Sequence, residues 1–274
     1  MSYANFKPTI WSKYIQHELD KLTVFKNDCD YKFEGEAGEG KRLKIVAAYP
    51  PTIGTYTPGS NISTAETIAD SSVYLDINQF KYFHFIVDDI DKAQAMDGMM
   101  EAYMQEATRA LAEDTDTFLA QDISTNAGAA SATSSGNSAA EMKLAIDTGL
   151  STIWDNGVRM GKDKVTIYLA PWMYTFFQDQ LISDKTANDQ LVKSGAIGMY
   201  KGAYVKMTNN LYNDTTDDYA IIKTDKAYAF CDGINKTESY RPDLLFADAI
   251  KGLHSYGGKM IRPKEAYTMK LHNS

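Results

Sequence analysis

The feature that most constrains this chain is a polar excursion between two strand-like segments, which leads without a linker into a very long helical pattern. The outgoing segment is 43–49 and the returning one is 73–87. Residues 50–72 between them are polar, rich in Pro and Gly turn signals and almost free of bulky apolar side chains. A two-stranded ribbon with such a tip cannot bury a core of its own and is marginal in water. We therefore expect another chain to cover it, which indicates a subunit of an assembly.

The returning segment changes pattern along its length. At its start, Val73, Leu75 and Ile77 face one way while polar side chains face the other, because side chains alternate across a strand. From Phe80 to residue 87 both faces are apolar. The pattern predicts one strand that is half-exposed at its outer end and buried on both faces where it reaches the body.

A helix is predicted from residue 88 to about residue 122, roughly 50 Å long at 1.5 Å per residue. Asp88, Asp89 and Asp91 lie at its start, where carboxylates cap the first turn and the helix dipole favours them. The same three carboxylates have the oxygen chemistry of a hard-cation site. Capping explains all three without a ligand, so we favour capping.

The segment up to residue 33 carries apolar residues at helical spacing, among them Trp11, Tyr14 and Leu19. This segment is too small to fold alone. We therefore interpret it as an arm that lies on something else.

The second half of the chain mixes helices and strands. Its pattern predicts a small-residue loop, a helix, a strand, a helix opened by Pro171 and a further strand, at 124–140, 141–156, 164–170, 171–182 and 219–230. No regular βαβ repeat is present, which indicates an α+β fold.

Composition excludes several classes of protein. The 274 residues suit one large domain or two modest ones, and a net charge of −8 argues against a basic surface that neutralises nucleic-acid phosphates. Cys29 and Cys231 form no CxxC pair, so we expect no disulfide framework and a reducing compartment. No apolar run reaches the roughly 18 residues of a membrane helix, and the polar start is not a signal peptide. We expect a soluble intracellular product with no membrane partner.

A possible phosphate-binding loop lies at 35–42, with the spacing GxxxxGK. Arg42 takes the place of the Ser or Thr that would hold Mg²⁺. Glu34, Glu36 and Glu39 would repel phosphate, and the strand-like segment that follows offers no helix N-terminus. A flexible turn is the better interpretation.

The remaining candidates for chemistry are weak. Residues 213–218 are more typical of a solvated turn than of a Ca²⁺ loop, because they lack the ligand spacing and the Gly of an EF-hand. His84 lies in mid-strand among aromatics, where a satisfied core imidazole is the default. His17 does not begin an HExxH motif, and GxSxG is absent. We expect no enzyme, no cofactor and no metal site.

The aromatic content stands out, with 18 Tyr and 11 Phe, many of them on strand-like segments. Tyr suits surfaces that are half apolar and half wet, as interfaces are. Ordinary core packing of strands explains the same residues equally well, so both interpretations stay open.

Four phrases in order along the chain carry a resemblance to a known family: AYPPTIGTYTPG (48–59), FIVDDIDKAQA (85–95), ALAEDTDTFLA (110–120) and GLHSYGGKMIRP (252–263). With the aromatic returning strand, they closely resemble the major capsid (coat) proteins of tailed bacteriophages, which have the HK97-like fold. The likeness covers nearly the whole chain. It specifies a structural role and no catalytic residue.

The resemblance implies the parts of that fold. They are an N-arm at 1–33, an extended E-loop with its strands at 34–87, a peripheral domain at 88–159 with a spine helix at about 88–122, an axial domain at 160–235, and C-terminal strands at 236–274 that return to both domains.

The resemblance also implies partners. Such proteins form hexamers and pentamers that tile an icosahedral shell around double-stranded DNA, held without sequence-specific binding. We expect a separate scaffolding protein and a portal, assembly in the host cytoplasm, and residence in the virion. An encapsulin-type protein nanocompartment shares the fold and is the alternative. The residues expected at contacts between subunits are Trp11, Tyr14, Tyr49, Ile53, Tyr56, Tyr74 and Tyr82.

Overall fold

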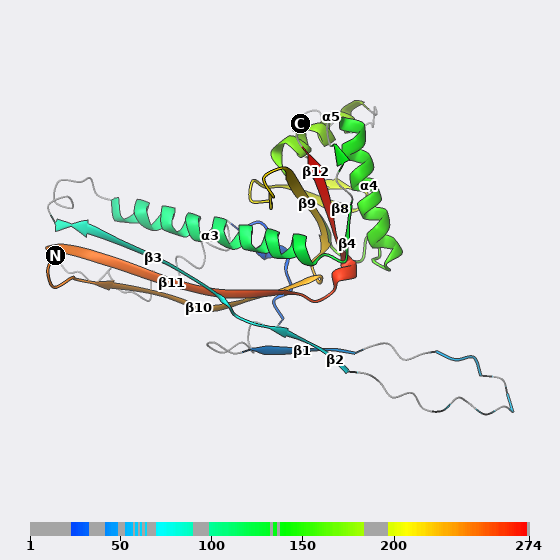
Figure 1. Ribbon diagram of the computed structural model, residues 1–274, viewed down its shortest axis with the longest axis horizontal. Coiled ribbons are helices and arrows are strands. Elements are labelled where there is room, and N and C mark those ends of the chain that lie inside the picture. Colours follow the sequence, from blue (N-terminus) through cyan, green and yellow to red (C-terminus); the bar gives the residue numbers. More distant parts are fainter. Residues whose placement is uncertain are drawn as a thin grey trace.

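The structure is a computed structural model that describes residues 23–32, 42–48, 53–56, 58–59, 61, 64, 70–89, 99–131, 134–135, 138–183 and 197–272. The subunit is elongated (Figure 1). A long helix lies lengthwise beside three long strands, a compact body sits at one end, and a thin hairpin projects below it.

The long sheet has the order β10-β11-β3 and is antiparallel throughout. Its strands are β3 (Gln79–Asp88), β10 (Tyr228–Tyr240) and β11 (Ala247–Met260). Helix α3 (Met99–Asn126) covers one face, where Met104, Leu111 and Ala112 pack with Ile250, against Phe83 and Phe85. The long sheet and α3 thus form two layers, and α3 covers one face of the sheet.

The compact body is built on a second sheet of order β4-β12-β9-β6-β8-β7, with β5 also paired to β12. The strands are β4 (Ala129–Ala130), β5 (Ser134–Ser135), β6 (Val165–Leu169), β7 (Met199–Tyr200), β8 (Ala203–Met207), β9 (Asp217–Thr224) and β12 (Ala266–His272). Helices α4 (Ala139–Asp155) and α5 (Pro171–Ser183) pack on each other, and α4 also packs on β12. The described residues also form two one-turn 3-10 helices, η1 (Lys26–Asp28) and η2 (Pro263–Glu265).

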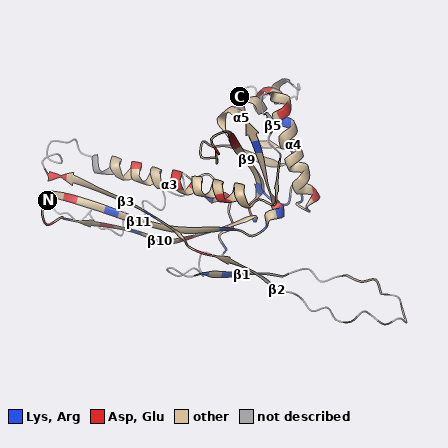
Figure 2. Ribbon diagram, viewed as in Figure 1, with Lys and Arg blue, Asp and Glu red and all other residues tan. Residues whose placement is uncertain are grey.

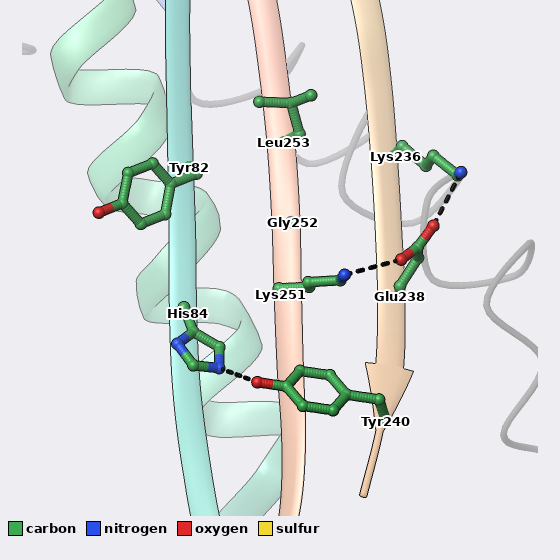
Figure 3. A pocket seen from close by; sticks show the side chains of 8 residues that line it. All are labelled: Tyr82, His84, Lys236, Glu238, Tyr240, Lys251, Gly252 and Leu253. Carbon is green, nitrogen blue, oxygen red and sulfur yellow. Dashed lines mark hydrogen bonds and ion pairs between the residues drawn. The ribbon is translucent and has the colours of Figure 1, made fainter. Parts of the chain in front are cut away.

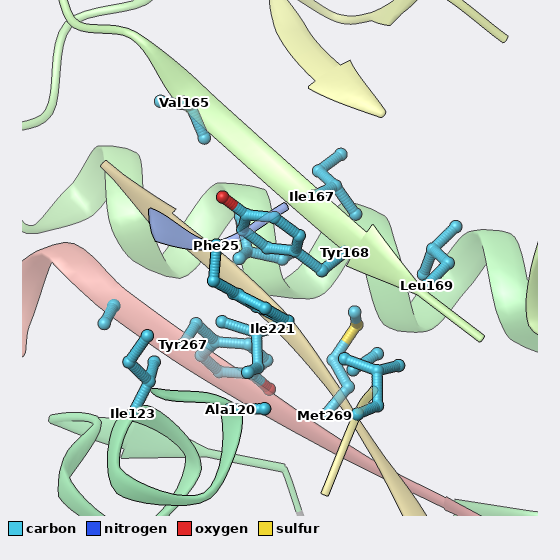
Figure 4. Packing of buried hydrophobic residues seen from close by; sticks show 14 of the residues in the cluster. Phe25, Ala120, Ile123, Val165, Ile167, Tyr168, Leu169, Ile221, Tyr267 and Met269 are labelled. Atoms are coloured by element: carbon cyan, nitrogen blue, oxygen red, sulfur yellow. The ribbon is translucent and has the colours of Figure 1, made fainter. Parts of the chain in front are cut away.

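The main core lies between the compact sheet, its helices and the end of α3. Every residue of β6 is buried, as expected of a central strand. Ala120 and Ile123 of α3 belong to the same core as Ile167, Tyr168 and other sheet residues (Figure 4). Helix α3 therefore joins the long sheet to the compact body.

The predicted α+β class is confirmed, and so are α4, β6 and α5, each within two residues of its expected start. Local signals account for this. Ser138 caps α4 by accepting a hydrogen bond from the Glu141 N–H at 3.2 Å, and Pro171 opens α5.

The single returning strand predicted at 73–87 is wrong. The chain forms β2 (Asp70–Leu75), which pairs with β1 (Leu43–Ala48), and then β3, which pairs with β11 in another sheet. The change occurs where the chain crosses Gly257 closely. A Cβ atom at Gly257 would lie 2.3 Å from the carbonyl oxygen of Asp76.

The predicted burial of both faces near the body is also wrong. Side chains along β3 alternate between partly covered and exposed, and Phe80, Tyr82 and Ile86 face solvent. The reason is that α3 covers only one face of the long sheet.

Asp89 is already helical, and residues 90–98 lie outside the described residues, so the cap expected at the start of the helix stays a prediction. Asp88 is the last residue of β3, opposite Ala247, and the Asp89 N–H donates to the Phe246 carbonyl at 3.0 Å. The described part of α3 starts at Met99 and ends at Asn126, four residues beyond the expected end. Residue 91, the third acid of the predicted cap, lies outside the described residues.

Two further boundaries differ from expectation. The strand predicted at 219–230 is divided between β9 and β10 by a turn in which the Ala227 N–H donates to the Thr224 carbonyl at 3.3 Å, and the two strands belong to different sheets. The small-residue segment predicted as a loop contributes β4 and β5, which pair with β12 in parallel.

Segments expected in the N-arm and in the peripheral domain pack within the body of their own subunit. Residues 23–32, expected in the arm, pack in the core of their own subunit, where Phe25 is fully buried. Helix α4, expected in the peripheral domain, packs on α5 and β12 of the compact body. The arm segment before residue 23 lies outside the described residues.

Candidate assembly surfaces

The projecting hairpin is anchored firmly at its base. Leu43, Ile45 and Leu75 are buried against Ala229 and Cys231 at the start of β10. A fixed base means that the position of the hairpin is set by its own subunit.

An ion pair reinforces this base. The Arg42 guanidinium donates to both carboxylate oxygens of Asp76, at 2.6 and 3.1 Å, and lies 5.1 Å from the centre of the Tyr74 ring. Its hydrogen bonds lower the pKa of the Asp76 carboxyl. Residues 35–41 of the predicted turn lie outside the described residues, and Arg42 itself binds a carboxylate of its own chain.

The described part of the hairpin tip offers apolar side chains to solvent. Ile53 is 94% exposed and Tyr56 is 62% exposed. This piece lies far from the body of the subunit (Figure 1). Two large apolar side chains at a projecting tip stabilise nothing in the subunit itself, which is typical of a surface that a partner covers.

The uncovered face of the long sheet carries a groove of about 560 Å³ (Figure 3). It is lined by Tyr82 and His84 of β3, Lys251, Gly252 and Leu253 of β11, and Lys236, Glu238 and Tyr240 of β10. Tyr82 is 77% exposed. The groove thus combines aromatic and apolar walls with a charged edge.

The charges of this groove are largely paired within it. Glu238 binds Lys236 at 2.7 Å and Lys251 at 3.1 Å, and these two hydrogen-bonded lysines lower the pKa of its carboxyl. The groove is therefore suited to an uncharged segment that has apolar side chains.

His84 is not the core imidazole that the sequence predicted. It is exposed on the open face, 2.9 Å from the Tyr240 hydroxyl, and its ring stacks on the Tyr240 ring with the centroids 5.9 Å apart. The prediction failed because the aromatic neighbours of His84 are themselves divided between a covered and an open face.

A third apolar surface lies at the turn between β10 and β11, the end of the long sheet furthest from the compact body (Figure 1). Leu244 is 95% exposed, Phe246 is 82% exposed and Leu245 is also exposed. An ion pair between Arg241 and Asp89 holds the turn against the end of β3. Sequence reasoning missed this surface, although the run Leu-Leu-Phe after Pro242-Asp243 was the available signal.

Four of the predicted contact residues are in the described part of the chain. Ile53 and Tyr56 lie at the hairpin tip, Tyr74 at its base and Tyr82 in the groove, and all four are exposed. The tip and the groove are not brought together within one subunit, because the hairpin projects away from the long sheet (Figure 1). Trp11, Tyr14 and Tyr49 lie outside the described residues.

The turn at 213–218 is held by its own side chains. Asp214 accepts hydrogen bonds from the Asp217 N–H at 2.9 Å and the Thr216 N–H at 3.2 Å and pairs with Lys270 at 3.1 Å. These contacts lower the pKa of Asp214 strongly. Across the described parts of the chain, no group of three His, Cys, Asp or Glu residues is placed to hold a metal ion.

Three further properties follow from the described residues. Cys29 and Cys231 are free and buried. None of the described helices is both long enough and apolar enough to cross a membrane. Charged side chains are spread along α3, the long sheet and the compact body, and α3 carries several acidic ones (Figure 2).

No family model and no curated protein sequence matches the chain. Among solved structures, one from Mycobacterium phage Che8 is similar over 90% of each chain, with 30% identity and a TM-score of 0.78. The capsid structure of the cyanophage P-SCSP1u matches 92% of this chain and 89% of its own, at 15% identity and a TM-score of 0.74. A virus-like particle from Pyrococcus furiosus matches 95% of this chain and 98% of its own, at 12% identity and a TM-score of 0.63.

The two more distant structures show the fold, and the Che8 structure shows the family. The neighbours are shell proteins and not enzymes. The chain belongs to the major capsid proteins of tailed bacteriophages with the HK97-like fold, and it is a structural shell protein of the virion.

Proposed function

We propose that this capsid protein assembles as hexamers and pentamers into an icosahedral shell that encloses double-stranded DNA. The observation that carries the proposal is the separation of two matching surfaces. The hairpin tip exposes Ile53 and Tyr56, and the open groove exposes Tyr82 and Leu253, but the hairpin points away from the groove of its own subunit. Only a second copy can bring the two together.

The hairpin of one subunit is proposed to lie across the long sheet of its neighbour. Residues 49–69 contain a single charged side chain, Glu66, so their insertion leaves few charges to desolvate. The Lys236–Glu238–Lys251 ion pairs at the edge of the groove can stay wet at the rim of such a contact. Tyr49 and Tyr74 are proposed to add contacts along the hairpin.

Two further contacts complete the proposed lattice. The apolar turn at 244–246 is proposed to meet equivalent turns of other subunits, and the arm is proposed to clasp an adjacent subunit with Trp11 and Tyr14. Each contact can be weak, because a closed shell repeats every contact many times and multivalency supplies the stability.

The proposed relation to DNA is containment without adhesion. The net charge of −8 disfavours binding by phosphate neutralisation, so the wall would enclose packaged DNA without binding to it. We propose that a separate scaffolding protein and a portal act during assembly, which takes place in the host cytoplasm.

The decisive test shortens the hairpin. Residues 49–69 are replaced by Asn-Gly, a two-residue turn that suits the last antiparallel pair, Ala48 and Asp70. We expect a folded subunit with an unchanged unfolding midpoint that no longer forms shells by electron microscopy and sedimentation. A matched control substitutes Ser for Thr55 and Thr64, which keeps the length of the hairpin and should leave assembly intact. Shells of normal size from the shortened chain would refute the role of the hairpin.

An encapsulin-type nanocompartment is the second candidate function, and the fold match to the virus-like particle from Pyrococcus furiosus favours it. The two candidates differ in content. Particles purified from infected cells should contain nuclease-resistant double-stranded DNA if the chain forms a viral shell. A protein cargo without DNA would support the nanocompartment.

A further inference from the structure

Residues 23–32 lie at the junction of α3, the long sheet and the compact body, and their contacts reach all three. We call this segment the strap. It has little regular structure, a single 3-10 turn at Lys26–Asp28, yet Thr23, Phe25, Lys26, Asp28 and Cys29 are all buried. Irregular segments usually run over the surface, because their backbone polar groups need hydrogen-bond partners when they are buried.

The contacts of the strap with α3 use the backbone. Asp116, a buried carboxylate in the middle of α3, accepts the Val24 N–H at 2.8 Å and the Phe25 N–H at 3.2 Å. The Asp116 side chain therefore accepts hydrogen bonds from two backbone N–H groups that are not part of a strand. Burial raises the pKa of Asp116, and these hydrogen bonds oppose that rise.

The contacts of the strap with the long sheet use Lys26 and Asp30. Lys26 binds Asp232 of β10 at 2.5 Å, and the opposite oxygen of Asp232 faces His254 of β11 at 3.2 Å. Asp30 forms a short parallel bridge with Ala229, donating its N–H to the Tyr228 carbonyl at 2.9 Å. The strap is thus paired with the base of β10.

The contacts of the strap with the compact body converge on Asp28. Its carboxylate binds Lys164 of the segment before β6 at 2.6 Å, Lys206 of β8 at 2.5 Å and the Tyr168 hydroxyl at 2.6 Å. The buried Lys223 of β9 donates to the Asp28 carbonyl oxygen. Phe25 stacks on Tyr168 with the ring centroids 4.2 Å apart.

We propose that the strap fixes the angle between the long sheet and the compact body. Lys26 and Asp28, two residues apart, direct their charges to partners on different sheets. A change of angle must therefore break the buried Lys26–Asp232 pair or separate the buried Asp28 carboxylate from its lysine partners. Breaking a buried ion pair is costly because it leaves an uncompensated charge. A fixed angle gives each copy a defined relation between its long sheet and its compact body before any contact with a neighbour.

The test measures this angle directly by electron-spin distance measurements. Spin labels are placed through Ser239→Cys on β10 and Thr175→Cys on α5, both exposed positions, and labelled subunits are diluted with unlabelled ones. A chain without the added cysteines reports any labelling of Cys29 and Cys231, which are buried. We expect one narrow distance distribution in the wild type and a broadened or shifted one in Asp28→Asn and in Lys26→Met.

The control is Asp163→Asn, which removes another carboxylate that is paired with a lysine. Its partner, Lys226, lies at the same end of the compact sheet as Lys164. This variant should keep the wild-type distribution. If folded Asp28→Asn and Lys26→Met keep it as well, the proposal is overturned.

A second measurement does not depend on whether the variants fold. In the wild type, the Val24 and Phe25 amides should exchange with solvent about 100-fold or more slowly than free amides, as the core strands do. Exchange at the rate of an open loop would refute the strap. Both measurements are made on the subunit. They can therefore support the proposed role of the strap even if the chain forms no shell, and shell formation would not count in favour of that role.

Discussion

At the scale of single residues, the most informative group is the charge cluster around Asp28. Burial alone would raise the pKa of its carboxyl, but hydrogen bonds from Lys164, Lys206 and Tyr168 lower it to about 2. The ordinary value is 3.8. The cluster is therefore arranged for the ionised carboxylate, and its contribution to stability depends on that charge.

This cluster predicts how stability changes with pH. A carboxyl whose pKa is lowered in the folded state stabilises that state above its unfolded pKa, and the contribution is lost as the pH falls through the folded pKa. Asp28→Asn should lower the free energy of unfolding by about 2 kcal/mol at pH 7, and the difference from wild type should shrink between pH 4 and pH 2. Urea unfolding at several pH values measures both.

The comparison for this prediction is Asp155→Asn, at an exposed position near the end of α4. We expect a change below about 0.5 kcal/mol at pH 7. A wild-type advantage over Asp28→Asn that persists undiminished at pH 2 would contradict the assigned role of the charge.

At the scale of elements, β3 shows how one strand serves two purposes. Phe83 and Phe85 point toward α3 and belong to the subunit, whereas Tyr82 and Ile86 point to the open face. Alternation along a strand separates these two sets of side chains. One strand therefore carries side chains that pack within the subunit and side chains that remain exposed for the proposed contact.

Substitutions on the two faces of β3 should affect different properties, stability on one face and assembly on the other. Phe83→Ala removes packing against α3 and should cost about 2–3 kcal/mol of unfolding free energy. Tyr82→Thr keeps a side chain suited to strands and should change that free energy by less than about 0.5 kcal/mol, while reducing shell yield. Urea unfolding and particle counts by electron microscopy give the two readouts. A stable Tyr82→Thr chain with the normal shell yield would argue against the groove as a contact.

The same elements show what the sequence could and could not predict. Ser138 and Pro171 are local signals, so α4 and α5 were placed to within two residues. The break at 76–78 has no local signal, because the alternation of side chains continues through it and the cause is the close approach of Gly257, far along the chain. The open face of β3 was missed because apolar alternation does not say whether a neighbouring helix or a neighbouring subunit covers a face. The strap was missed because its partners come from five separate segments.

At the scale of the whole molecule, charge and apolar surface act in opposite directions on assembly. Every copy carries a net charge of −8, so copies repel one another, while the exposed tip, groove and turn favour contact. The balance depends on salt, because screening shortens the reach of repulsion from about 30 Å at 0.01 M to about 8 Å at 0.15 M and leaves apolar burial intact.

Raising the ionic strength over this range should therefore lower the protein concentration at which shells appear. Light scattering and sedimentation at a series of salt concentrations measure that threshold, and the thermal midpoint of the hairpin-shortened subunit serves as the control for stability. Shells that dissolve as salt is added would show instead that attraction between opposite charges holds the subunits together.

The lengthwise alignment of α3 with β3, β10 and β11 also gives the subunit a mechanical direction (Figure 1). A pull along the strands acts on covalent backbone and must shear a whole ladder of hydrogen bonds at once. A pull across them can open the β3–β11 ladder one bond after another, because antiparallel hydrogen bonds run perpendicular to the strands. Under outward pressure we therefore expect the subunit to be stiffer along its long axis than across it.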